Sequence, residues 1–177
     1  EFGRVLFRSD FYDHHFLYHV ALIPCTFGDL RLGAKWAAVT FSSLAFLAVW
    51  YLFERQKIPY AWLWSLGLLG ISEAFLYRMS ISRAQSLSLG VMALGLAWMF
   101  EGKYKHLAVL SFLYVWMYNA FPLMIVLAGC YTAAVYLLEK RLEPRPLLYS
   151  GFGILTGLVV NPYFPNNLVF TYHHFIA

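Results

Sequence analysis

Long stretches without a charged side chain dominate this sequence and limit what it can fold into. The longest runs from Leu107 to Leu138, 32 residues without Asp, Glu, Lys or Arg. The whole chain is 61% hydrophobic, 20% aromatic and only 12% charged, whereas a soluble domain carries about 25% charged residues. This combination indicates a polytopic membrane protein.

Six segments have the length and polarity of membrane spans. The hydrocarbon core of a bilayer is about 30 Å thick and takes roughly 17–25 apolar residues as a helix. As one helix, Leu107 to Leu138 would be about 48 Å long, and Pro122 near its middle favours a break. We therefore expect two spans there. The predicted fold class is all-α, a polytopic transmembrane helical bundle of about six spans: residues 36–53, 60–77, 84–100, two within 107–138, and 146–160.

The segments outside the spans divide the chain further. Residues 1–9 read like the translation of a sequencing adapter, so we expect them to be foreign to the protein. Residues 10–35 are predicted to be an outer loop with an interfacial helix, because the apolar stretch 16–28 is short and contains Pro24. Residues 36–160 are the predicted transmembrane region, and residues 161–177 an outer-face segment that we expect to be truncated.

Lysine and arginine in the short loops predict the orientation of the bundle. Seven of them fall at one end and four at the other. The first end has Arg55, Lys57, Lys103, Lys105, Lys140, Arg141 and Arg145, and the second has Arg31, Lys35, Arg78 and Arg83. We expect a multi-pass integral membrane protein, in the inner membrane if the source is bacterial, whose second end faces outward. Nearly all of the Asp and His residues fall at this outer end.

The first outer segment holds two acids and three imidazoles, namely Asp10, Asp13, His14, His15 and His19. On a helix His15 and His19 are four residues apart and share a face. Such a group could bind a divalent cation or supply a general base with hydrogen-bonding partners. The alternative is an aromatic, histidine-rich anchor at the membrane interface. An anchor explains the Tyr and Phe residues of the segment but not its pair of acids.

The second outer segment contains two arginines in a very short loop. Arg78 and Arg83 suit a phosphate or diphosphate, because a guanidinium matches the geometry of these anions. Snorkelling of the arginines toward lipid headgroups is the alternative. Glu73 lies about one turn inside the same end of its predicted span. An ionisable group in lipid is a functional candidate, and an ion pair with Arg78 or Arg83 is the competing interpretation.

The third outer segment follows the last predicted span. Asn161, His173 and His174 lie here, and Pro162 and Pro165 bracket an aromatic pair, so we expect the chain to leave the helix and follow the surface. The histidines reach the same face as Asp13 only if the chain breaks near Pro122. A plain interfacial turn is the alternative.

The arrangement resembles a family of membrane enzymes. An outer loop with the sequence Asp10-Phe-Tyr-Asp13-His14-His15 precedes an interfacial helix, the stretch from Gly28 to Lys35, and many spans with short loops. This is similar to the GT-C superfamily of glycosyltransferases, which use lipid-phosphate-linked sugars and include the oligosaccharyltransferase catalytic subunits. Tyr77-Arg78-Met79-Ser80 is similar to the arginine-containing end of a later span in that family. The loop from Arg78 to Arg83 lacks acidic residues, which favours a simpler sugar transferase.

The resemblance implies sugar transfer at the outer surface of the membrane. Asp13, or secondly Asp10, would deprotonate the acceptor, and Arg78 and Arg83 would stabilise the leaving lipid phosphate. A divalent metal, Mg²⁺ or Mn²⁺, is a candidate cofactor. The expected partners are a lipid-phosphate-linked sugar donor, an acceptor of unknown identity and membrane lipids, with no nucleic acid. The remaining candidates are His14, His15, Glu73, Asn161 and His173 for substrate binding, and Asp10, Asp13 and His14 for the metal.

Two other functions fit parts of the sequence. A transporter or flippase for a lipid-linked sugar would use the same arginines to bind phosphate and break no bond, with Glu73 in a coupling role. A membrane di-iron oxygenase would use histidine boxes. Such boxes usually need about eight histidines on the inner side, whereas five fall on the outer side here.

Overall fold

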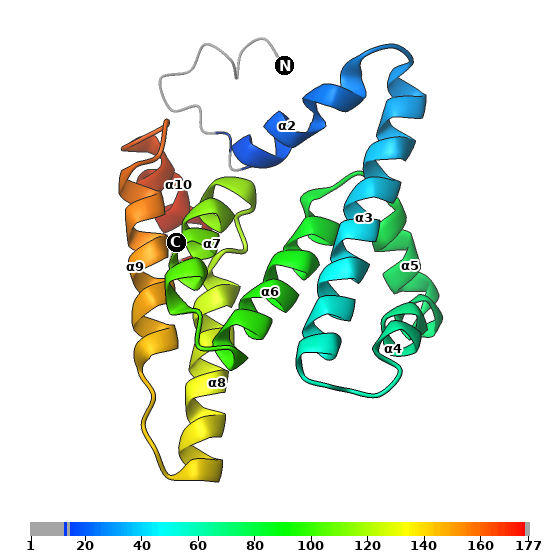
Figure 1. The fold of residues 1–177 in the computed structure, drawn as a ribbon. Coiled ribbons are helices and arrows are strands. Elements are labelled where there is room, and N and C mark those ends of the chain that lie inside the picture. The colour runs from blue at the N-terminus through cyan, green and yellow to red at the C-terminus, as the bar shows by residue number, and fades with distance from the viewer. Residues whose placement is uncertain (1–12, 14, 176–177) are drawn as a thin grey trace.

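The computed structural model describes residue 13 and residues 15–175, and these residues form an all-helical fold without strands (Figure 1). Asp10 and His14 lie outside the described residues. The predicted fold class is confirmed at the level of an all-α chain. Among the described residues, two helices are long and apolar enough to cross a membrane by length and composition: Leu30–Arg55 (α3) and Pro122–Glu139 (α8).

A short helix and one long helix begin the fold. Phe16–Leu22 (α2) continues into the 3₁₀ turn Ile23–Thr26 (η1), in the region where an interfacial helix is predicted. Asp29 then caps α3 by accepting the backbone N–H of Arg31 at 2.8 Å. Gly33 is required here, since a Cβ would lie 1.8 Å from the carbonyl oxygen of Cys25. This contact fixes the angle between η1 and α3.

The second predicted span is not one continuous helix. Residues 60–77 contain Ala61–Gly67 (α4), the 3₁₀ turn Leu68–Gly70 (η2), and the first part of Glu73–Ser80 (α5). Ser72 interrupts the helix because its extended backbone lets its hydroxyl accept the N–H of Phe75 at 3.1 Å. Ser65 and Ser42 donate hydrogen bonds to carbonyl oxygens of Phe46 and Met79, which attach α4 and α5 to α3.

The second half of the chain follows the predicted pattern of helices closely. Ala84–Phe100 (α6) has the bounds that the sequence predicts. The region from 107 to 138 is divided into Tyr104–Met117 (α7) and α8, with the break directly before Pro122. Arg145–Val159 (α9) and Asn166–Phe175 (α10) complete the described chain. The predicted break near Pro122 is therefore confirmed.

Glycines allow close helix packing between α7 and α9. A Cβ on Gly153 would lie 2.2 Å from the carbonyl oxygen of Ala108, and one on Gly157 would lie 2.9 Å from that of Phe112. The indole N–H of Trp116 donates to the carbonyl oxygen of Gly157 at 2.9 Å across the same contact. Close approach of helices at small residues is typical of membrane proteins.

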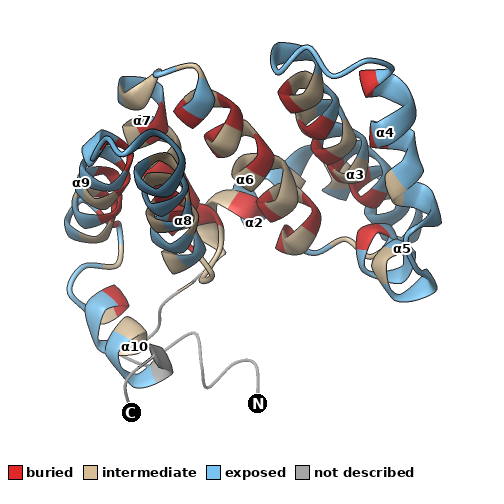
Figure 2. Ribbon diagram, turned by 90° about the horizontal axis from the view of Figure 1, so that it is seen from below, coloured by how far each residue is buried: buried red, intermediate tan, exposed pale blue. Residues whose placement is uncertain are grey.

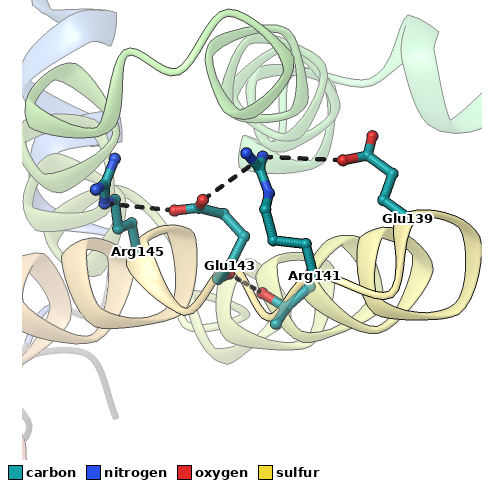
Figure 3. A network of polar contacts seen from close by, with 5 residues as sticks. Glu139, Arg141, Glu143 and Arg145 are labelled. Carbon is teal, nitrogen blue, oxygen red and sulfur yellow. Dashed lines mark hydrogen bonds and ion pairs between the residues drawn. The ribbon is translucent and has the colours of Figure 1, made fainter.

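The charged side chains of the basic end pair with one another between neighbouring loops. Glu101 is 3.1 Å from Arg55 Nε and 2.5 Å from Lys103 Nζ, which joins the ends of α3 and α6. Figure 3 shows the second group, in which Glu143 lies between Arg141 and Arg145 at 3.7 and 3.5 Å. The loop after α3 and the loop between α8 and α9 lie at the lower end of Figure 1, opposite α2.

Large apolar side chains cover much of the outer surface. Figure 2 shows that buried residues face the interior between α3 and α6, whereas the outer sides of α4, α8 and α9 are exposed. Exposed examples occur on each of these helices and on α3: Trp36, Leu47, Trp62, Trp64, Val126, Leu137, Phe152 and Leu155. Contiguous apolar surface of this extent marks an interaction with lipid or protein.

Candidate functional site

A cavity of about 410 Å³ opens at the end of the fold where α2 lies. Three parts of the chain that are far apart in sequence form its walls: α2, the loop leading into α6, and the break between α7 and α8. The lining residues are His15, Tyr18, His19, Ser82, Arg83, Ala84, Gln85, Tyr118 and Asn119. The volume lies in the range of small-molecule sites in proteins, which is about 300–1,000 Å³.

Asp13 and His19 form a hydrogen-bonded pair beside this cavity. One carboxylate oxygen, Asp13 Oδ2, is 2.7 Å from His19 Nδ1, and the other accepts the backbone N–H of His15 at 3.0 Å. Asp13 therefore fixes the start of α2 and the orientation of the His19 ring together. When Asp13 is ionised, its contact places the proton on Nδ1 and leaves Nε2 of a neutral His19 to accept one.

The histidines share one face of α2, as their spacing predicts. The ring centroids of His15 and His19 are 6.2 Å apart. His15 also stacks on Tyr118 with a centroid distance of 5.3 Å and an interplanar angle of 26°. This stacking brings the break between α7 and α8 against α2. Because Pro122 sets the position of the break, it also places Tyr118 and Asn119 in the cavity wall.

Tyr18 lines the same cavity, but its hydroxyl is buried and unsatisfied. Its residue is only 4% exposed, and within residue 13 and residues 15–175 its hydroxyl has no hydrogen-bond partner. Burial, and secondly the neighbouring Cys25 thiol, raises the pKa of Tyr18 to about 12. The hydroxyl therefore stays protonated and keeps a hydrogen to donate. A buried polar group without a partner is costly and rare in native proteins.

Another wall is the first turn of α6. Arg83 is the N-cap residue of this helix, and no side chain caps its free backbone amides. Arg83 is exposed, and it forms no ion pair with any residue the structure describes. This wall therefore presents a guanidinium and the positive end of a helix dipole.

The segment after α9 approaches α2 from another side. The rings of Phe16 and Tyr163 are 6.0 Å apart. Burial, and secondly the charge of Asp13, raises the pKa of Tyr163. Asn161 is buried and its side chain accepts the backbone N–H of Tyr163 at 2.9 Å, which shapes the turn. The chain thus returns to the face of Asp13, as the predicted break near Pro122 requires.

Three other predicted site residues do not line the cavity. Arg78 is exposed near the end of α5, and Glu73 is exposed in the first turn of the same helix. Neither forms an ion pair among the described residues, so the predicted pair of Glu73 with an arginine is not formed there. His173 is exposed on α10, with its ring 5.7 Å from that of Tyr172.

Of the three predicted metal ligands, the structure describes Asp13. No three His, Cys, Asp or Glu side chains gather as a metal-binding group within the described ranges. Asp13, the described member of the predicted ligand set, is engaged with His19 and the amide of His15. The other two predicted ligands, Asp10 and His14, lie outside those ranges.

Six lining residues are absent from the sequence-based site: Tyr18, Ser82, Ala84, Gln85, Tyr118 and Asn119. Asn119 lies three residues before Pro122, in the break that the sequence predicts. The predicted break could therefore have indicated both Asn119 and Tyr118 as lining residues. Tyr18 and Gln85 have no such signal, because an aromatic in an apolar helix and a polar residue after a loop are common.

No protein-family model, curated protein or solved structure matches the chain.

Proposed function

We propose that this chain belongs to a multi-pass membrane protein with the cavity on its outward side. A core helix of a soluble protein is mostly buried, yet only 33% of the apolar window of α3 and 11% of that of α8 are buried. The exposed tryptophans and leucines on α4 and α9 extend this apolar surface beyond those two helices. Arginines and lysines cluster at the end away from the cavity, which the positive-inside tendency assigns to the cytoplasm.

The proposed reaction is transfer of a sugar from a lipid-phosphate-linked donor to an acceptor hydroxyl. A single observation carries it: one cavity is lined by His19, which Asp13 holds from beside the cavity, and by Arg83, which forms no ion pair with any described residue. Glycosyl transfer needs a proton acceptor and a group that stabilises the leaving phosphate. His19 with Asp13, and Arg83, are residues of these two types.

In the proposed step the acceptor hydroxyl attacks the anomeric carbon of the donor sugar. The new bond joins the acceptor oxygen to this carbon, and the bond from the carbon to the phosphate oxygen breaks. The phosphate leaves with the electron pair, next to Arg83, and the hydroxyl proton moves to His19 Nε2. Asp13 is a positioning residue in this step: it holds the ring and stabilises the imidazolium that forms. This role replaces the direct proton transfer predicted for Asp13.

Sugar transfer is tested with full-length protein in proteoliposomes that contain a radiolabelled polyprenyl-phosphate sugar and a panel of acceptors. We expect a glycosylated product, and we expect His19→Ala to lower its rate by at least about 100-fold, the effect of removing a general base. His106→Ala is the matched control, because His106 lies at the opposite end of α7 from the cavity.

Imidazole in the buffer provides a second readout. If His19 transfers a proton, imidazole should restore part of the activity of His19→Ala, whereas a purely structural role predicts no recovery. Translocation of the labelled lipid without any glycosylated product would contradict the proposed enzyme and support the transporter.

A further inference from the structure

We propose that the ends of α6 and α8 at the basic end of the fold form a binding site for an anionic phospholipid of the cytoplasmic leaflet. One acyl chain lies in an apolar groove between the two helices, and the loop after α8 binds the headgroup. This site is at the opposite end of the molecule from the cavity of His19 and Arg83. It rests on the proposed placement of the chain in a membrane and not on sugar transfer.

An apolar groove of about 370 Å³ runs along α8 toward the basic end. Its lining on α8 extends from Leu127 to Glu139, and Leu96 and Phe100 of α6 contribute to the other wall. The lining positions of α8 are three or four residues apart, so they form one face of the helix. Glu139, at the end of the groove, is the one charged residue that lines it among the described residues.

The length of the groove matches one leaflet of a bilayer. From Leu127 to Glu139 the helix rises about 18 Å, and half of the hydrocarbon core is about 15 Å thick. The rings of Phe100 and Tyr131, 5.5 Å apart at 74°, hold the two walls together at this level. A lipid chain that enters from the cytoplasmic surface therefore finds an apolar groove over the whole depth of its leaflet.

The walls of the groove are open to the surroundings of the protein. Only 11% of the apolar window of α8 is buried, and Leu138 in the groove is 85% exposed. Cys130 and Ala134 leave the hollow, because their side chains are smaller than those of Leu127 and Leu138 on the same face. A packed helix would also cover this face, but it supplies no negative group for the basic loop beside it.

The charge of this end favours an anionic lipid. Its three loops carry seven basic and four acidic side chains. Glu139 is 3.9 Å from Arg141, which is also 3.7 Å from Glu143 (Figure 3), so the carboxylate in the groove is opposed by a guanidinium. Lys140 directly follows Glu139, is exposed, and forms no ion pair with any residue that the structure describes. A lysine without a neutralising partner therefore lies next to the end of the groove.

The helix itself does not attract the headgroup. The C-terminal end of α8 carries a partial negative charge, which opposes a phosphate. Binding of the headgroup must therefore come from side chains, above all from Lys140. A lysine near an anionic membrane surface increases binding about fivefold. Phosphatidylcholine has the same phosphate but no net charge, so it should gain little from Lys140.

The headgroup is tested by native mass spectrometry of the full-length protein in detergent. The protein is titrated with phosphatidylglycerol and, separately, with phosphatidylcholine that has the same acyl chains. We expect phosphatidylglycerol to bind at least about fivefold more tightly, and Lys140→Gln to weaken it by about fivefold. Lys57→Gln is the matched control and should bind like wild type. Lys57 is exposed at the same end and also has a positive φ, 55° against 54° for Lys140, but it lies in the loop after α3.

The groove is tested by filling it. Ala134→Phe should weaken both lipids by about tenfold or more, the effect of displacing about two methylene groups of the chain. Ala133→Phe is the control, because Ala133 is the exposed neighbour that does not line the groove. Ala134→Leu is a smaller filling variant, and the melting temperature of each variant shows that it is folded.

Three results would overturn the site: equal affinity for the two lipids, wild-type affinity in Lys140→Gln, or wild-type affinity in both folded Ala134 variants. A helix that occupies the groove in the full-length protein would give the first and third of these results. None of the measurements requires glycosyl transfer, so the lipid site and the sugar transferase are tested separately.

Discussion

At the scale of single residues, polar side chains in this apolar chain form two kinds of pair, one within a short stretch of sequence and one between distant segments. Asp13 meets His19 one turn into α2, and Glu101 meets Arg55 from a different helix. Spacing along a helix can predict neighbours within a short stretch of sequence, as it does for His15 and His19. Spacing does not predict pairs between distant segments, because Glu101 and Arg55 come together only when α3 packs against α6.

Glu101 provides a pH test of this end of the fold. Its hydrogen bond to Lys103 lowers the pKa of Glu101 below its usual 4.5, opposed by burial and helped by Arg55 and Tyr51. A carboxyl with a lowered pKa in the folded state stabilises the fold above pH 4.5, and this contribution is lost as the pH falls through the lowered value.

We therefore expect Glu101→Gln to lower the melting temperature at pH 7 by roughly 2–4 °C, the shift that about 1 kcal/mol produces in a chain of this size. The effect stays modest because Arg55 and Lys103 are themselves about half exposed. Below pH 4 the variant and the wild type should converge. Glu54→Gln, which removes an exposed acid without an ion pair in the described region, is the control. A gap that persists unchanged at pH 3 would contradict this explanation.

At the scale of elements, hydrophobicity and proline predict where helices lie but not how straight they are. The bounds of α6 and the break before Pro122 follow from the absence of charge and from the geometry of proline. The interruption at Ser72 was not predicted, because serine and glycine are tolerated inside apolar helices. There, the hydrogen bond from Phe75 N–H to the Ser72 hydroxyl competes with the helix. Among the glycines, Gly153 and Gly157 lie against α7, whereas a Cβ at Gly151, Gly67 or Gly70 would meet nothing within 4 Å.

Gly153 and Gly151 make a matched pair on α9. Gly153→Ala places a methyl group 2.2 Å from a backbone oxygen of α7, so the two helices must separate. We expect a loss of about 1–3 kcal/mol in the free energy of unfolding. Gly151→Ala meets no atom within 4 Å and should be neutral or stabilising by up to about 1 kcal/mol, the helix propensity gained.

Unfolding of both variants in the same detergent, followed by circular dichroism, measures the difference. Equal stability of the two variants would show that the contact between α7 and α9 does not depend on Gly153.

At the scale of the whole molecule, the chain separates its chemistry between two ends. One end holds paired charges and most of the basic residues, and the other holds the cavity. Exposed apolar side chains lie on the helices between them. The sequence predicted this separation from the positions of Asp, His, Lys and Arg. It could not predict which of these residues share a cavity, because His15, His19 and Arg83 are brought together by packing, whereas Arg78 and Glu73 are exposed and do not line it.

The account depends most on Asp13 acting through His19 in sugar transfer. The decisive measurement is the initial rate of transfer from a polyprenyl-phosphate sugar by full-length Asp13→Asn and Asp13→Glu, compared with Asp29→Asn. Asp29 only caps α3, a role that asparagine fills equally well. We predict that Asp13→Asn lowers kcat by at least about 100-fold with little change in KM, because the wrong tautomer of His19 is held. Asp13→Glu should recover part of the rate, and Asp29→Asn should match wild type. A wild-type rate in Asp13→Asn would contradict the account.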